Sequence, residues 1–424
     1  MTSIERTILL AKGAGIKEFI ITIGYLGNKI KTYLADGKKY GVKIDYVENK
    51  EWEKGNGISV LKAKKLLTEN FVLLMSDHIF DSRILQSLLN HNMKSSVTLA
   101  IDRRKAISDD TKVLEKNGKI VDISKNIKKY NCIDTGIFIC SSKIFSYLEE
   151  AIKEGKTELA FGIAKAAQNR DAEIFDITQI NKYVPSMWKE VKPFWIDIDT
   201  KDDLKKAKKL IIENACRGRN DLLATYINKP IENFIVNRLA SRQITPNQIT
   251  IITNIIAYLG TFLFFRGYLI FASFLTFIVS FMDGVDGKLA RVKLATSNIG
   301  KMEHASDYLF EHSWYIALAI YLSNTFGVLP VLLSTFILLF DGFSHYCECA
   351  FEKVIKNRSL EDYGKIEQLF RKFDGRKNSY IIFILIGVLI EYPIGSLFAI
   401  FIWSMISALF YCFRTMKHIL DVNT

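Results

Sequence analysis

The stretch MDGVDGKLARVKLATSNIGKMEHASDYLFE (282–311) places Asp283, Asp286, Glu303 and Asp307 after the apolar run YLIFASFLTFIVSF (268–281). An ionisable residue inside a bilayer costs roughly 2.5–3.5 kcal/mol on insertion scales, so acids beside a membrane-like segment usually have a function. Asp283 and Asp286 are three residues apart, and Glu303 and Asp307 are four apart. On helices, each pair therefore lies on one face.

Two antiparallel neighbouring helices would bring these four carboxylates to one point, where they repel unless cations lie among them. Hard oxygen ligands suit Mg²⁺ or Mn²⁺, which share their coordination shell with phosphate oxygens. Gly287 and Ala290 are small and allow close approach, and Arg291 can pair with a carboxylate or a phosphate. The alternative is a structural network in which the acids pair with Arg291, Lys288 and Lys293.

The composition of the 424-residue chain changes near its middle. Lys, Asp and Glu are frequent in residues 1–245, whereas long apolar runs fill 249–413. The apolar runs predict six membrane spans, at 248–265, 268–285, 301–323, 327–346, 378–392 and 394–414. We therefore expect a cytoplasmic α/β domain over 1–217, a juxtamembrane helix and linker over 218–245, and an all-α six-helix transmembrane domain over 246–424.

Basic residues predict the orientation of these spans. The connectors after the first, third and fifth spans hold a single Arg266, whereas the connector after the fourth is rich in Lys and Arg. The basic first half lies on the same side as that connector, so we expect a multi-pass protein of the cell membrane with both termini in the cytoplasm. The net charge of +12 is then largely a matter of topology, and nucleic acid is not an expected partner.

Apolar residues from Leu222 to Leu239 recur at helical spacing, with basic residues between them. This pattern predicts an amphipathic helix in the plane of the lipid headgroups. A linker helix packed on the soluble domain is the alternative.

Residues 219–424 resemble the CDP-alcohol phosphotransferases, whose motif is Asp-x2-Asp-Gly-x2-Ala-Arg-x8-Gly-x3-Asp-x3-Asp. The positions in register are Asp283, Asp286, Gly287, Ala290, Arg291 and Gly300, and TPNQIT (245–250) resembles the segment that opens the family's first span. Strict spacing from Gly300 puts His304 and Tyr308 where the last two acids belong. We prefer a register shifted by one residue, Glu303-x3-Asp307, because His304 and Tyr308 cannot replace two carboxylates at a magnesium site.

This resemblance implies a role for each motif residue. Asp283, Asp286, Glu303 and Asp307 would hold Mg²⁺ or Mn²⁺ at the pyrophosphate of a CDP-alcohol. Asp307 would also accept the proton of the acceptor hydroxyl, which attacks the β-phosphate and expels CMP. The implied CDP-alcohol contacts are Asp283, Gly287, Ala290, Arg291 and Ser297. Arg376 and Lys377 look like a clamp for the acceptor phosphate, with ordinary cytoplasmic charge as the alternative, and a homodimer is expected.

Residues 3–215 alternate apolar strand-like runs with helical stretches, which predicts a doubly wound α/β domain. The runs are 18–24, 42–47, 70–76 and 97–101. A glycine-bearing turn (53–60) leads into a helix, Asp77 ends the strand NFVLLMS, and WIDIDT (195–200) precedes the helix 201–215. Such positions bind ligands at the edges of open sheets, although each residue could merely cap a helix.

Together these features resemble sugar-phosphate nucleotidyltransferases, specifically the CTP-dependent inositol-1-phosphate type. The resemblance implies that Asp77 and Asp197 hold magnesium and that Asn56 and Ser59 form the base pocket. That family begins with a strand and a glycine-rich loop for the triphosphate of CTP, and the first sixty residues contain no such loop. We therefore expect an N-terminally truncated, Rossmann-like domain that is inactive in cytidylyl transfer as given.

A fusion of these two domains resembles bifunctional enzymes of archaea and thermophiles. These enzymes make CDP-inositol and then transfer its phospho-inositol group to inositol-1-phosphate, giving di-myo-inositol phosphate phosphate. A phospholipid-forming CDP-alcohol phosphatidyltransferase with a non-catalytic soluble domain is the first alternative. A non-catalytic membrane anchor or divalent-ion transporter is the second, and the glycine, alanine and arginine in register disfavour it.

Overall fold

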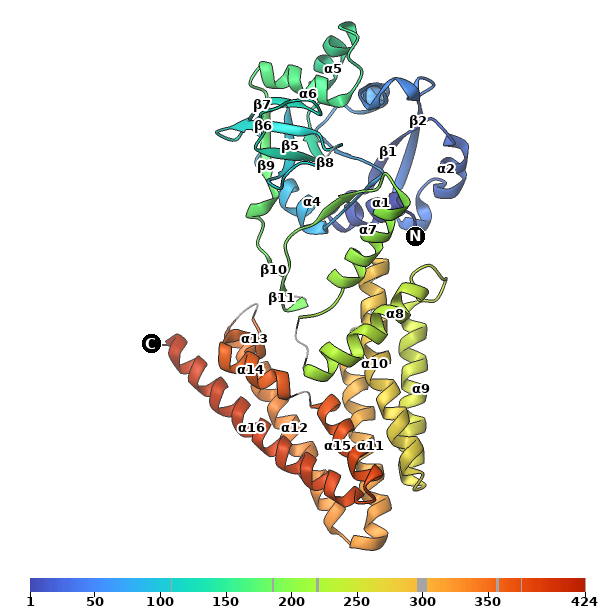
Figure 1. Cartoon of the computed structure of the whole chain (residues 1–424), viewed down its shortest axis with the longest axis vertical. Helices are drawn as coiled ribbons and strands as arrows, with labels where there is room; N and C mark the ends of the chain where they lie inside the picture. Colours follow the sequence, from blue (N-terminus) through green and yellow to red (C-terminus); the bar gives the residue numbers. More distant parts are fainter. Residues whose placement is uncertain are drawn as a thin grey trace. The chain divides into compact units, whose positions relative to one another are not determined.

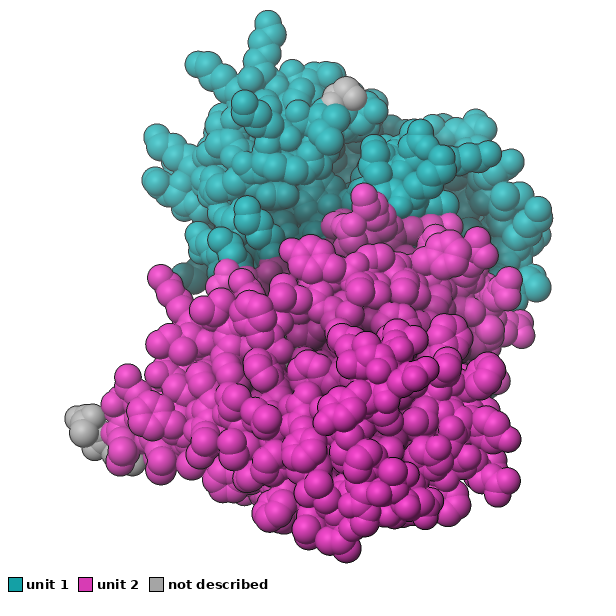
Figure 2. Space-filling model, turned by 60° about the horizontal axis from the view of Figure 1, so that its bottom comes forward, with its two compact units in different colours: residues 1–182, 192–207 teal, residues 183–191, 208–424 magenta. Residues whose placement is uncertain are grey.

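The computed structural model describes residues 1–107, 109–184, 187–218, 221–295, 303–355, 358–374 and 376–423, with the backbone only for Glu303, His304, Asp362, Val422 and Asn423. The chain forms two compact units. Unit 1 comprises residues 1–182 and 192–207, and unit 2 comprises residues 183–191 and 208–424. Figure 2 colours the two units separately.

Unit 1 is an α/β fold (Figure 1). Its helices are α1 (Ser3–Gly13), α2 (Gly27–Leu34), α3 (Asn56–Lys62), α4 (Ser82–Leu89), α5 (Ile144–Lys153), α6 (Leu159–Gln168) and the first half of α7 (Lys201–Asn214), with short 3-10 turns at Lys38–Tyr40, Trp52–Lys54, Ala63–Leu66 and Ile177–Gln179. Its strands are β1 (Glu18–Ile23), β2 (Lys43–Glu48), β3 (Phe71–Leu74), β4 (His78–Phe80), β5 (Val97–Asp102), β6 (Lys112–Lys116), β7 (Lys119–Ser124), β8 (Cys132–Cys140), β9 (Ala172–Asp176) and β12 (Trp195–Asp197).

The main sheet of unit 1 has six strands in the order β3-β8-β5-β9-β7-β6, and β1–β2 and β4–β12 form separate pairs. β1 pairs parallel to β2 and β5 parallel to β9, whereas β8 runs antiparallel to both β3 and β5. The four predicted strands are present. The sheet is mixed. The sequence did not predict this, because short apolar runs indicate strands but not the direction in which they pair.

The core of unit 1 lies where α5 and α6 cover the main sheet. β5 and β8 are buried along nearly their whole length. This burial explains why VTLAI reads as a continuous apolar run with no polar alternation. Helix α6 packs on β7 and β9, and α4 packs on β8.

Unit 2 is helical apart from the short hairpin of β10 (Tyr183–Val184) and β11 (Lys189–Glu190). Its helices are the π-helical turn Ala224–Asn228, α8 (Lys229–Leu239), α9 (Pro246–Phe265), α10 (Leu269–Lys293), α11 (Glu303–Phe326), α12 (Leu329–Val354), α13 (Leu360–Tyr363), α14 (Lys365–Phe373), α15 (Lys377–Leu389) and α16 (Pro393–Asn423). Helices α10 and α11 both pack along α9, α15 packs on α10 and α16, and α12 packs along α16.

Four of the described helices, α9, α10, α12 and α16, are long and apolar enough to cross a membrane. The other two predicted spans are also helical. However, α15 has 13 residues and is only about 20 Å long, and α11 carries acidic residues in its first turns. Unit 2 is thus a membrane domain by its helices, with four apolar candidate spans among the described residues.

The sequence TPNQ sets the start of α9. The Thr245 hydroxyl accepts a hydrogen bond from the Gln248 amide, and the Gln248 side chain accepts one from the Thr245 amide at 2.9 Å. Pro246 occupies the first helical position, where no amide donor is needed. This fixed start places Thr250 and Asn254 on the first turns of α9, facing α10 and α11 respectively.

Helix α8, from the predicted amphipathic segment, packs on α10 within unit 2. Lys288 of α10 is 2% exposed, and its Nζ donates to Glu232 Oε2 at 2.6 Å and to Asn233 Oδ1 at 2.9 Å. The fit is close, since a Cβ on Gly284 would lie 2.3 Å from Glu232 Oε1.

A second polar chain joins the same segment to α10 and α15. Asn228 Nδ2 donates to Ser280 Oγ at 2.9 Å, Ser280 Oγ donates to Asn378 Oδ1 at 2.7 Å, and Asn378 Nδ2 donates to Asp221 Oδ2 at 2.7 Å. Polar contacts, and not an apolar face alone, therefore hold α8 and the turn before it.

Candidate active sites

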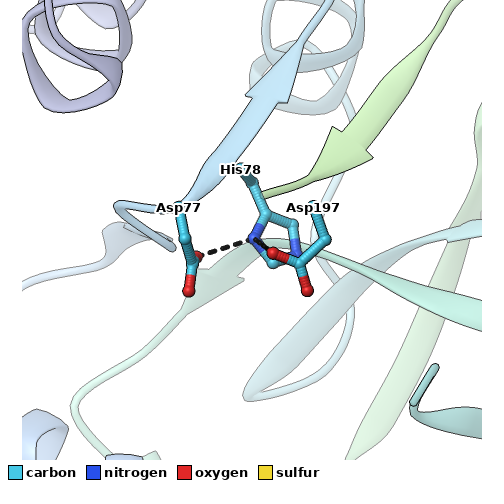
Figure 3. A group of neighbouring side chains, drawn as sticks. All are labelled: Asp77, His78 and Asp197. Carbon is cyan, nitrogen blue, oxygen red and sulfur yellow. Dashed lines mark hydrogen bonds and ion pairs between the residues drawn. The ribbon is translucent and has the colours of Figure 1, made fainter. Parts of the chain in front are cut away.

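In unit 1, Asp77 and Asp197 come together because of one antiparallel strand pair. β4 begins at His78, one residue after Asp77, and the register of β4 with β12 sets Asp197 opposite His78. His78 Nδ1 lies 2.8 Å from Asp77 Oδ1 and 3.6 Å from Asp197 Oδ1 (Figure 3). The backbone supports this arrangement, because the Ile198 amide donates to the Asp77 carbonyl at 3.1 Å.

Packing fixes the imidazole of His78 in this orientation. The ring stacks on Trp195 with a centroid distance of 5.8 Å and an interplanar angle of 10°. Gly136 lies against the other part of the ring and has a φ of +73°. A Cβ there would be 2.6 Å from His78 Cδ2, so both the backbone conformation and the ring require glycine.

The charges of this cluster affect one another. The hydrogen bond from His78 lowers the pKa of Asp77. Burial raises the pKa of Asp197, and the neighbouring charge of Asp77 adds to that shift. Burial opposes protonation of His78, but its hydrogen bond to Asp77 and the charges of the surrounding aspartates raise its pKa overall. Burial also raises the pKa of nearby Asp134 to about 6. The cluster therefore favours a cation.

Asp77, His78 and Asp197 fit a divalent metal ion. Among the described residues they are the one group of three His, Cys, Asp or Glu residues whose ligand atoms all lie within 4.8 Å of one another. Asp197 Oδ1 is buried and makes no hydrogen bond. Sequence reasoning selected both aspartates but missed His78, although its position directly after Asp77 at the end of a buried strand was a usable signal.

Asn56 and Ser59 make contacts within the chain. Asn56 Oδ1 accepts a hydrogen bond from the Leu159 amide at 2.8 Å and so caps the first turn of α6. Ser59 Oγ accepts one from Asn49 Nδ2 at 3.0 Å. Their role in a base pocket stays a prediction.

In unit 2, the two acids of α10 have different surroundings. Asp286 is 3% exposed, and its Oδ2 accepts a hydrogen bond from Thr250 of α9 at 2.6 Å. Asp283 Oδ2 pairs with Lys377 Nζ at 2.6 Å. Arg291 donates through Nε to the Ala215 carbonyl at 2.7 Å, while Gly287 and Ala290 continue the same helix. Thr250 comes from the TPNQIT segment, so that motif directly orients a predicted metal ligand.

Lys377, at the start of α15, connects the acids of α10 and α11. It interacts electrostatically with Asp283, Asp307 and Glu311, and its ammonium lies 5.6 Å from the Phe310 ring centre. Glu311 was missed from sequence, although it follows Asp307 by four residues and therefore lies on the same helix face. Within the described part of unit 2, no three acids have ligand atoms within 4.8 Å of one another.

Three other predicted positions have limited or different surroundings. Ser297 lies outside the described residues, as does the side chain of Glu303, whose backbone begins α11. Arg376 Nη2 contacts Glu348 Oε1 at 2.7 Å and Glu361 Oε1 at 3.2 Å, and its guanidinium lies 5.2 Å from the Tyr411 ring centre. Arg376 is thus held by acids, whereas Lys377 points to the motif.

Comparisons with known proteins agree with both halves. Residues 2–214 match the family described as nucleotidyl transferase, and residues 243–411 match the family described as CDP-alcohol phosphatidyltransferase. A protein of Aquifex aeolicus named "Bifunctional IPC transferase and DIPP synthase" is 30% identical over 77% of this chain and 71% of its own length. The chain belongs to this bifunctional family. It is therefore a transferase with a nucleotidyltransferase domain followed by a CDP-alcohol phosphotransferase domain.

Other members of the bifunctional family give similar matches. The proteins of the same name from Rubrobacter xylanophilus and Thermococcus kodakarensis are 28% and 27% identical over 72% and 70% of this chain, which spans 67% and 64% of their lengths. A solved structure titled as the inositol-1-phosphate CTP transferase from T. maritima is 24% identical, covering 49% of this chain and 80% of that one at a TM-score of 0.40. The resemblance stated from the sequence motifs is confirmed at the level of the family.

Proposed function

We propose that unit 2 transfers the phospho-inositol group of CDP-inositol to a hydroxyl of inositol-1-phosphate. The products are CMP and di-myo-inositol phosphate phosphate. The observation that carries this proposal is the ion pair of Asp283 with Lys377, whose ammonium also feels the charge of Asp307, in a chain whose first half is a nucleotidyl transferase. That first half, together with the relatives' names, favours a soluble inositol phosphate over a lipid acceptor.

The donor set of unit 2 suits a hard cation, because carboxylate oxygens are the ligands that Mg²⁺ and Mn²⁺ take in proteins. Asp283, Asp286, Glu303 and Asp307 would hold that ion, which supplies neutralising charge at the pyrophosphate when bound. The Thr250 hydroxyl holds the Asp286 carboxylate in one orientation. Thr250, on α9, is therefore a positioning residue.

Asp307 accepts the proton as the acceptor oxygen bonds to the β-phosphorus and the bond to CMP breaks. Lys377 then has two partners in turn. In the metal-free protein it neutralises Asp283, and with metal and substrate present its ammonium is available for the acceptor phosphate. Arg376, fixed between Glu348 and Glu361, holds the start of α15 in place.

All six predicted spans cross the membrane in this proposal, with both termini in the cytoplasm. Support comes from α11 and α15, which pack inside the same helix bundle as the four apolar spans. The fully buried Trp314 of α11 donates to the Ala257 carbonyl of α9 at 2.9 Å. A membrane helix whose backbone groups are all hydrogen-bonded within the protein can be short, or polar on the face that packs against its neighbours.

In this proposal unit 1 is the domain for making CDP-inositol from CTP and inositol-1-phosphate, and its expected inactivity as given stays a prediction. Asp77 and Asp197 would hold the metal that neutralises the triphosphate. Their approach across the β4–β12 pair supports that role, as does the buried, unbonded Asp197 Oδ1.

The test of the main proposal is CMP release by the purified full chain. CDP-inositol with inositol-1-phosphate should give metal-dependent CMP and the phosphodiester, whereas CDP-diacylglycerol should give neither. Asp283→Asn or Asp286→Asn should abolish CMP release in a protein that stays folded in detergent. Glu391→Gln, an exposed acid in the turn between α15 and α16, is the matched control and should keep full activity. Metal-dependent turnover by either aspartate variant would refute the assignment.

A further inference from the structure

We propose that His78 is itself a ligand, through Nδ1, of the metal ion held by Asp77 and Asp197, and that this nitrogen makes the site select a first-row transition-metal ion over Mg²⁺. The proposal rests on the metal role of the two aspartates given above. It adds a ligand of a different chemical kind, and with it a preference among metals.

The distances suit ligands of one ion, although the shorter one is also that of a hydrogen bond. Ligand atoms about 2.1 Å from an ion, at neighbouring octahedral positions, lie about 3 Å apart. His78 Nδ1 is 2.8 Å from Asp77 Oδ1 and 3.6 Å from Asp197 Oδ1. The second distance is too long for a hydrogen bond, and Asp197 Oδ1 is left buried without one. Small movements of both carboxylates would place an ion between all three.

The imidazole is held in the orientation that a ligand needs. It stacks on Trp195, whose Nε1 donates to Asp102 Oδ2 at 3.0 Å and whose ring lies 4.8 Å from the Arg104 guanidinium. Gly136 blocks the opposite edge. With its side chain 13% exposed, His78 cannot turn Nδ1 to solvent without disturbing these contacts. Such support of a ligand by surrounding groups is common at metal sites.

The chemistry of the donor set gives the preference. Mg²⁺ takes oxygen ligands and keeps several waters, whereas imidazole nitrogen binds transition-metal ions better. Two carboxylates and one imidazole still leave positions for phosphate oxygens. The competing view is that His78 only donates a hydrogen bond that orients Asp77, and that view predicts no metal–nitrogen bond.

The decisive measurement is pulsed electron paramagnetic resonance of bound Mn²⁺, which detects ¹⁴N coupling when a histidine nitrogen is a ligand. The sample is the full-length chain carrying Asp283→Asn and Asp286→Asn, so that the acids of unit 2 do not hold Mn²⁺. We expect ¹⁴N coupling in this background, its loss in His78→Gln, and its retention in His91→Gln, which removes the one other histidine of residues 1–182. Gly136→Ala, which keeps the imidazole but displaces it, should weaken the coupling.

Metal affinities provide a second readout. His78→Gln should weaken Mn²⁺ binding by about 10-fold or more and change Mg²⁺ binding much less, since removing a metal's supporting groups already costs 10- to 100-fold. Asp77→Asn should weaken both ions. Circular dichroism shows whether each variant is folded.

The outcomes separate this proposal from the proposed metal role of Asp77 and Asp197. Mn²⁺ that binds in an Asp77-dependent way without ¹⁴N coupling would show that the aspartates hold metal and that His78 does not. No binding of Mn²⁺ to the Asp283→Asn, Asp286→Asn protein would overturn both proposals. The spectrum of that parent protein decides the matter even if His78→Gln fails to fold.

Discussion

Replacing Lys288 with Met should destabilise unit 2 by about 3 kcal/mol. Lys288 is 2% exposed, and its ammonium is shared between Glu232 and Asn233 of α8. Removing one partner of a buried ion pair costs about 3–5 kcal/mol, because the other charge stays buried without compensation. We take the lower end because the Glu232 side chain keeps 14% exposure. For a unit of this size, about 3 kcal/mol lowers Tm by roughly 6–12 °C.

Thermal unfolding of the purified protein in detergent measures this effect. Adding Glu232→Met to Lys288→Met should restore most of the lost stability, since an uncharged pair leaves no buried charge. Lys209→Met is the control: its side chain is 77% exposed and lies 3.9 Å from Glu213, so we expect a change within about 0.5 kcal/mol. A Tm shift for Lys288→Met no larger than that of Lys209→Met would refute the reasoning that this pair holds α8 on α10.

Three further results are expected. Lys377→Met should tighten Mn²⁺ binding to unit 2, because Lys377 competes with the metal for Asp283, and should raise the KM for inositol-1-phosphate. Metal titration and initial rates test this, and weaker Mn²⁺ binding would contradict it. Asp307→Asn should lower CMP release by about 10²–10⁴-fold with CDP-alcohol binding retained, and His304→Ala should lower it far less; the reverse order would show that the shifted motif register is wrong. Burial raises the pKa of Asp134 from 3.8 to about 6, so the stability it contributes is complete below about pH 3.8 and is lost as pH rises through 6. With a chelator present, Asp134→Asn should therefore raise the free energy of unfolding, and with it Tm, at pH 7.5 but not at pH 3.5. The rise at pH 7.5 should be at most about 3 kcal/mol, and equal Tm shifts at both pH values would contradict this.

Sequence reasoning succeeded where the signal was local. The apolar run at 248–265 predicted the helix that the structure shows as α9, and β1, β2, β3 and β5 followed from short apolar runs. The two-domain organisation and the transferase families also followed from motifs that are contiguous in the chain.

Features that depend on distant segments were not predictable in the same way. His78 meets Asp197 only through the β4–β12 pairing, and no periodicity in either segment announces it. Arg376 reads as a free phosphate ligand in sequence, yet Glu348 and Glu361 hold it in the structure. Glu311 was overlooked because the family motif ends before it. The convergence of all four motif acids and the missing triphosphate loop stay predictions.

The contacts of α8 with α10 decide how much of the chain a fragment of the membrane domain must include. A fragment cut at residue 246, before the first apolar span, would lose Glu232 and Asn233, the partners of Lys288, and Asn228, which donates to Ser280. A fragment that starts ahead of Asp221 would keep both polar chains intact. A membrane domain joined to another soluble domain would therefore have to carry α8 with it to keep these contacts.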